Sequence, residues 1–153
     1  MGIANGLHDE LLRQAFDLVH KNLSNPTQAG LRRAVSSAYY SLFHLLINET
    51  VAHGSVDSSR EGLARMIEHR VMAKASDRIL DSRRFPFVQE DPALVEKLKS
   101  VAKAFCQLQI KRHIADYDNS TSWTHSEALG EVTTAARAFS TWDSIQDQKI
   151  AQD

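Results

Sequence analysis

Cysteine, proline and glycine are scarce in this chain of 153 residues, which has one cysteine, three prolines and six glycines. The single Cys106 excludes an internal disulfide and a cysteine-based metal cluster. The seven histidines are scattered and form no His-x3-His or His-Glu-x2-His pair. A Walker loop and a glycine-rich dinucleotide fingerprint are also missing from the sequence. We therefore expect neither a metal site nor a cofactor.

A dominant charge and long apolar runs are absent as well. The net charge is −1, with 24% charged and 42% hydrophobic residues, as in an ordinary soluble globular protein. This balance gives no overall attraction to nucleic acid, although it leaves a local basic patch open. The first residues lack the basic and apolar regions of a signal peptide, and no run is long enough to span a membrane. We expect a cytoplasmic protein without membrane contact.

Apolar residues recur at helical spacing along most of the chain, and no segment shows the alternation typical of a strand. The predicted helices span about residues 7–23, 26–52, 59–80 and 92–117, and a fifth begins after Thr124. The pattern over 59–80 is weaker than the others. The sequence thus predicts an all-α, up-and-down bundle of four long helices plus a shorter, variable third element. One domain covers residues 1–145, and residues 146–153 form a polar tail.

Capping residues indicate where two of these helices begin. Asn25 is suited to be an N-cap, Pro26 to be the first helical residue, and Gln28 to complete a capping box. Thr124 and Glu127 have the spacing of a second capping box before the last helix.

A polar stripe lies on the second helix, nearly opposite its apolar stripe. It contains Arg33, Ser37, Tyr40 and His44. A solvated outer face would explain this pattern. The aromatic and branched residues around it also fit a surface that contacts another helix or a second subunit.

Arg112 continues the apolar stripe of the fourth helix, and Asp116 follows it by one turn. Because an unpaired charge on the core side is costly, we expect an Arg112–Asp116 ion pair. The pair is either an internal strut or the mouth of a cleft in which the guanidinium binds a phosphate. His113 and Tyr117 flank it and offer proton transfer, stacking or hydrogen bonds.

Three segments together resemble the HEPN superfamily (higher eukaryotes and prokaryotes nucleotide-binding domain). They are RRAVSSAYYSLFHLLINE, RHIADYD and SEALGEVTTAARAF, within about residues 30–142. The resemblance implies an all-α bundle that is commonly a homodimer. It often implies a nucleotidyltransferase partner in a toxin–antitoxin or phage-defence system. Toxic members are metal-independent ribonucleases. Their motif has an arginine followed by a polar residue, and a histidine separated from the arginine by four to six residues.

The chain departs from that ribonuclease motif. Beyond Arg112, the positions expected to hold the histidine contain Tyr117, Asp118 and Asn119, and His113 is too close. Cleavage of RNA needs an acid–base group beside the phosphate as well as a cation. We therefore favour a non-catalytic HEPN-like module that binds a nucleotide, RNA or a protein partner. Its expected ligand-binding residues are Arg112, Asp116, Tyr117, Tyr40, His44 and Arg33.

Two other functions remain open from the sequence. A divergent ribonuclease toxin would combine Arg112 with His113 or His44 as the acid–base group, in a composite site across a dimer. A structural or interaction protein, such as the partner of a nucleotidyltransferase, would use Arg112 and Asp116 only as an internal strut.

Overall fold

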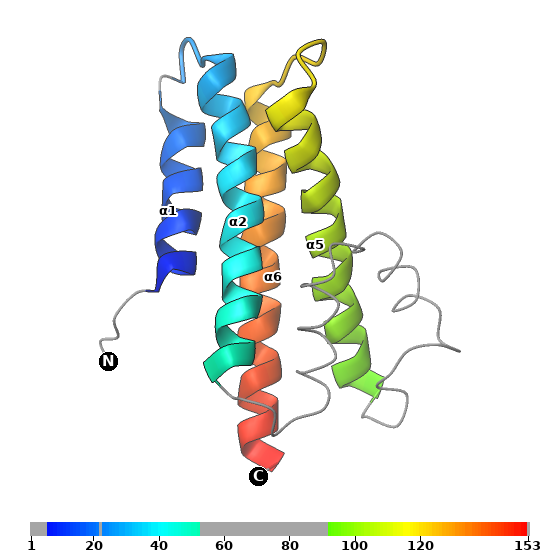
Figure 1. Ribbon diagram of the computed structural model, residues 1–153. Coiled ribbons are helices and arrows are strands. Elements are labelled where there is room, and N and C mark those ends of the chain that lie inside the picture. The colour runs from blue at the N-terminus through cyan, green and yellow to red at the C-terminus, as the bar shows by residue number, and fades with distance from the viewer. Residues whose placement is uncertain (1–5, 22, 53–91, 153) are drawn as a thin grey trace.

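The computed structural model describes residues 6–21, 23–52 and 92–152. Its helices are α1 (Leu7–His20), α2 (Gln28–Ala52), α5 (Pro92–Tyr117) and α6 (His125–Gln152). Every regular element within the described ranges is a helix, which confirms the predicted all-α bundle (Figure 1). The predicted third element, residues 59–80, lies outside the described residues.

The four helices lie side by side, and each runs antiparallel to the next one in the described chain (Figure 1). Helices α2 and α6 each contact the other three, while α1 and α5 lie on the two flanks. The α1–α2 connection and the α5–α6 loop are at the same end of the bundle. This arrangement brings the beginning of α2 beside the end of α5.

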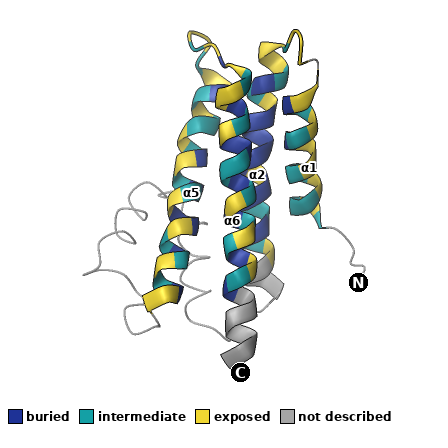
Figure 2. Ribbon diagram, turned by 180° about the vertical axis from the view of Figure 1, so that it is seen from behind, coloured by how far each residue is buried: buried dark blue, intermediate teal, exposed yellow. Residues whose placement is uncertain are grey.

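The core consists of the apolar stripes that the sequence predicts. Both stripes are buried: Leu31, Val35, Ala38, Leu42 and Leu46 on α2, and Leu94, Leu98, Val101, Phe105 and Leu108 on α5. Figure 2 shows the buried positions concentrated on α2 and on the inner faces of its neighbours. Burying each large apolar side chain contributes about 1.5–3 kcal/mol. The stripes therefore fix which face of α2 and α5 remains available for other contacts.

The predicted start of α6 is confirmed, whereas that of α2 is wrong. Glu127 N–H donates to the Thr124 hydroxyl over 3.1 Å, and the Glu127 carboxylate accepts from Thr124 N–H over 3.0 Å. Helix α2 begins two residues later than expected, because the Thr27 hydroxyl accepts the Gly30 N–H over 3.0 Å and acts as its cap. Gln28 forms no capping box there.

One other helix boundary also differs from the sequence prediction. Helix α1 ends at His20 instead of near residue 23, since Lys21 adopts an extended backbone conformation. Helix α6 continues to Gln152 and so includes most of the segment predicted as a polar tail. A polar composition alone does not end a helix when no proline or glycine interrupts it.

Candidate functional site

A groove of about 340 Å³ lies where the beginning of α2 meets the last turn of α5. We name it the α2–α5 groove; it is lined by Ala29, Arg32, Arg33, Ser36, Tyr40, Ala115, Asp116 and Tyr117. It contains predicted ligand-binding residues from both helices. Tyr40 is 38% exposed and Tyr117 is 67% exposed, so both phenol rings are accessible to a ligand.

Arg112 is not among the residues that line this groove, but it contacts two of them, Tyr40 and Asp116. Its guanidinium carbon is 5.0 Å from the centre of the Tyr39 ring and 5.7 Å from that of Tyr40. Arg112 Nη1 is 3.4 Å from Asp116 Oδ2, which is the ion pair that the spacing predicts. The side chain is only 18% exposed, and its Nε is buried without a hydrogen-bond partner in the described structure. The cation–π contacts with the two rings therefore offset much of the free-energy cost of removing this charge from water.

A second groove adjoins the first along α2. This α1–α2 groove, of about 460 Å³, is lined by Leu7, Leu11, Gln14, Arg33, Ser36, Ser37, Tyr40 and His44. Arg33, Ser36 and Tyr40 border both grooves. The polar stripe of α2 is thus the shared wall of two grooves. His44 lines the α1–α2 groove together with Tyr40, and the Arg112 guanidinium carbon is 5.7 Å from the centre of the Tyr40 ring.

His113 has a different environment from the other candidate residues. It is exposed on α5, and its ring lies 5.0 Å from the ring of Tyr117. It lines neither of the two grooves as the described residues define them. Of the two histidines considered as acid–base groups, His44 is the one that borders a groove.

Two side chains of α2 hold the α5–α6 loop against the bundle. Arg32 Nη1 donates to the carbonyls of Ala115 and Asp118 over 3.0 and 2.8 Å, and its Nη2 donates to that of Thr121. Gln28, one turn earlier, exchanges two hydrogen bonds of 2.7 and 2.8 Å with the backbone of Trp123. These bonds fix the last turn of α5 beside α2 and so position Asp116 and Tyr117 at the groove.

Sequence reasoning missed Arg32 and Ser36 as groove residues. Arg32 is adjacent to Arg33, and the helical pattern gives no sign that only one of them is bonded to a distant loop. Ser36 is 2% exposed and Ser37 4%, so the helix buries small polar residues next to the groove. The sequence signal for a polar site here was the pair Ser36-Ser37, which is separated from two tyrosines by one residue. Buried hydroxyls need hydrogen-bond partners, so such a pair indicates polar surroundings.

Comparison of the chain with family models, with curated proteins and with solved structures finds no match. Within the described ranges, no three His, Cys, Asp or Glu side chains are grouped so that they could hold a metal ion. None of the helices in the same ranges has both the length and the apolar character required to cross a membrane.

Asp118, at the start of the α5–α6 loop, is an acid whose ionisation supports the folded loop. The side-chain hydroxyls of Ser120 and Thr121 and the Ser120 N–H donate to its carboxylate and lower its pKa below the usual 3.8. A carboxyl whose pKa is lowered by folding stabilises the protein above its unfolded pKa and loses that contribution as pH falls through the folded pKa.

We therefore expect Asp118→Asn to lower the melting temperature at neutral pH. The difference from the parent protein should narrow as the pH falls below the ordinary carboxyl pKa of 3.8 and disappear once the folded carboxylate, whose pKa is lower, is protonated as well. Thermal unfolding followed by circular dichroism over a pH series measures this difference. Asn119→Ala, at the exposed neighbouring position, serves as the control. A pH-independent difference for Asp118→Asn would contradict the electrostatic origin.

Proposed function

We propose that the chain is a HEPN-like module that binds a nucleotide or RNA in the α2–α5 groove without cleaving it. One observation carries the proposal: Tyr40 offers an accessible ring in a groove that also holds Arg33, and the Arg112 guanidinium carbon lies 5.7 Å from the centre of that ring. An accessible aromatic ring beside cationic groups is the arrangement that binds bases and phosphates. The resemblance to the HEPN superfamily supports the same ligand class.

The chemistry of the groove suits an anion with a planar part. A base can stack on Tyr40 or Tyr117, both of which are exposed. A phosphate can bind the guanidinium of Arg33, which lies on the exposed side of α2. Asp116 neutralises part of the Arg112 charge and repels an anion, so we expect modest affinity for a single nucleotide.

The surroundings of Arg112 favour binding over cleavage. Tyr117 is exposed, and its ring lies 5.0 Å from that of His113. Asp118 is engaged by the hydroxyls of Ser120 and Thr121. Neither position supplies the histidine that acid–base catalysis at the phosphate would use. We further propose a homodimer, with a nucleotidyltransferase as partner in a toxin–antitoxin or defence system, on the resemblance alone.

A divergent ribonuclease is the second candidate, and His44 is the residue that favours it. His44 lines a groove that shares Arg33 and Tyr40 with the α2–α5 groove. An RNA strand across both grooves would place a phosphate between a cation and an imidazole.

The test measures binding of adenosine monophosphate by titration calorimetry. Tyr40→Leu and Arg33→Gln should each weaken binding about fivefold to tenfold, because each removes one stacking or charge-assisted contact. Arg13→Gln, an exposed cation on α1 that lines neither groove, should leave the affinity unchanged. Equal affinities for Arg33→Gln and Arg13→Gln would overturn the proposed site.

The same proteins incubated with a single-stranded RNA oligonucleotide separate binding from cleavage. Intact RNA together with retained binding supports the non-catalytic module. Cleavage that disappears in His44→Asn would establish the ribonuclease in its place. If nucleotide and RNA both fail to bind the parent protein, Arg112 and Asp116 act only as an internal strut.

A further inference from the structure

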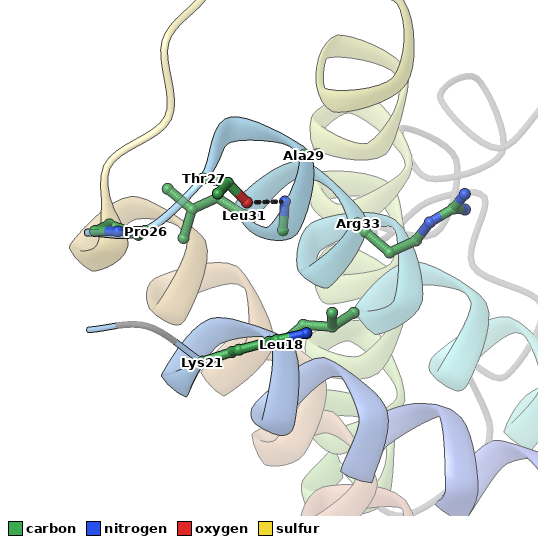
Figure 3. Close-up of a pocket in the computed structure, with 8 residues that line it drawn as sticks. Leu18, Lys21, Pro26, Thr27, Ala29, Leu31 and Arg33 are labelled. Carbon is green, nitrogen blue, oxygen red and sulfur yellow. Dashed lines mark hydrogen bonds between the residues drawn. The ribbon is translucent and has the colours of Figure 1, made fainter. Parts of the chain in front are cut away.

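A third cavity, of about 400 Å³, lies between the end of α1 and the beginning of α2 (Figure 3). We name it the helix-end pocket. Its lining is mainly apolar and consists of Leu18, Lys21, Pro26, Thr27, Ala29, Gly30, Leu31 and Arg33. Leu18 belongs to α1 and Lys21 directly follows it, and the other residues belong to α2 and the segment before it. Its size is within the range of small-molecule sites.

The charged groups at this pocket are both cations. Lys21 and Arg33 are exposed, and no carboxylate is among the lining residues. Within the described part of the chain, neither side chain forms an ion pair. The Arg33 guanidinium points away from Lys21 and Leu18 in Figure 3, and an exposed side chain of this kind can rotate to meet a bound anion. The Thr27 hydroxyl is already used by the Gly30 N–H.

The absence of a side chain at Gly30 keeps part of the pocket open. A Cβ at this position would meet only the Thr27 hydroxyl oxygen, at 3.0 Å, among atoms within 4 Å. Gly30 lies inside α2, where alanine would be the better helix former. Glycine there costs helix stability, and it leaves space beside two cations.

We propose that the helix-end pocket binds a small amphipathic carboxylate, with its apolar part on Leu18, Pro26 and Leu31 and its carboxylate between Lys21 and Arg33. Charge complementarity selects this ligand, because the apolar lining is bordered by cations alone. The site shares Arg33 with the proposed nucleotide groove and differs from it in Lys21, which lines the helix-end pocket and neither of the two grooves.

Octanoate is the probe, and the readout is amide chemical-shift change in nuclear magnetic resonance spectra of the full chain. Shifts should be saturable and concentrated on Leu18, Lys21 and residues 26–33. Octan-1-ol has the same apolar body without the charge, and acetate has the charge without the body. Both should bind at least about fivefold more weakly than octanoate, since each lacks one of the two contacts. Equal binding of octan-1-ol would overturn the anion site.

Two variants test the pocket itself. Lys21→Gln should weaken octanoate binding about threefold to fivefold by removing one cation. Gly30→Ala should also weaken octanoate binding by reducing the space, because the new Cβ would lie 3.0 Å from the Thr27 hydroxyl. Arg13→Gln, an exposed cation elsewhere on α1, should bind octanoate as the parent does. The proposal is wrong if Lys21→Gln and Arg13→Gln bind octanoate equally, or if the shifts map to another part of the bundle.

Discussion

Replacing Arg32 with alanine is expected to lower the free energy of unfolding by about 2–3 kcal/mol, since hydrogen bonds from a charged donor are lost and carbonyls lose their partner. Arg32 donates to the carbonyls of Ala115, Asp118 and Thr121, and so joins α2 to the α5–α6 loop. Urea unfolding followed by circular dichroism measures the change. In a protein of this size such a loss shifts the melting temperature by roughly 5–10 °C.

The adjacent arginine provides a matched control. Arg33 is exposed and borders the grooves, and it has no hydrogen bond or ion pair within the described residues. Arg33→Ala should therefore change the unfolding free energy by less than about 0.5 kcal/mol. The two variants remove the same side chain from consecutive positions of α2. Equal losses of stability would show that the loop does not depend on Arg32.

The bundle could be predicted from the sequence because its determinants are local. The apolar stripes of α2 and α5 follow the helical period, and all the residues assigned to them are buried. The Thr124–Glu127 capping box was likewise readable from a spacing of three residues. The start of α2 was assigned to the wrong cap, because Asn25 and Thr27 both have side chains that cap helices. The choice of Thr27 places Gln28 where its amide reaches Trp123.

The candidate site was only partly predictable, because it depends on contacts between distant segments. The Arg112–Asp116 pair follows from one helical turn, and the structure contains it. The stacking of Arg112 on Tyr39 joins two helices, and no spacing within either helix indicates it. The different roles of Arg32 and Arg33 also depend on a contact between distant segments. A helical wheel separates them by about 100°, and only the position of the α5–α6 loop decides which one is bonded.

Phe105→Ala is expected to cost about 3–5 kcal/mol of unfolding free energy, the range for removing a fully buried phenyl ring. Phe105 is 1% exposed, and its ring centre lies 5.4 Å from that of Tyr39 and 6.3 Å from that of Phe43. The Arg112 guanidinium carbon lies 5.0 Å from the centre of the same Tyr39 ring. The substitution therefore removes core packing and the support of the ring that holds the guanidinium. Urea unfolding measures the first effect.

The loss of support for the Tyr39 ring distinguishes Phe105 from an ordinary core residue. Leu98→Ala, about two turns earlier on the buried face of α5, should cost a comparable 2–5 kcal/mol. It leaves Phe105, Tyr39 and Arg112 in place. At low temperature, where both variants are folded, Phe105→Ala should bind adenosine monophosphate more weakly than Leu98→Ala does. Equal affinities at matched stability would mean that the aromatic cluster stabilises the bundle without positioning Arg112. A selective loss would place the determinants of ligand affinity in the core, one layer beneath the groove.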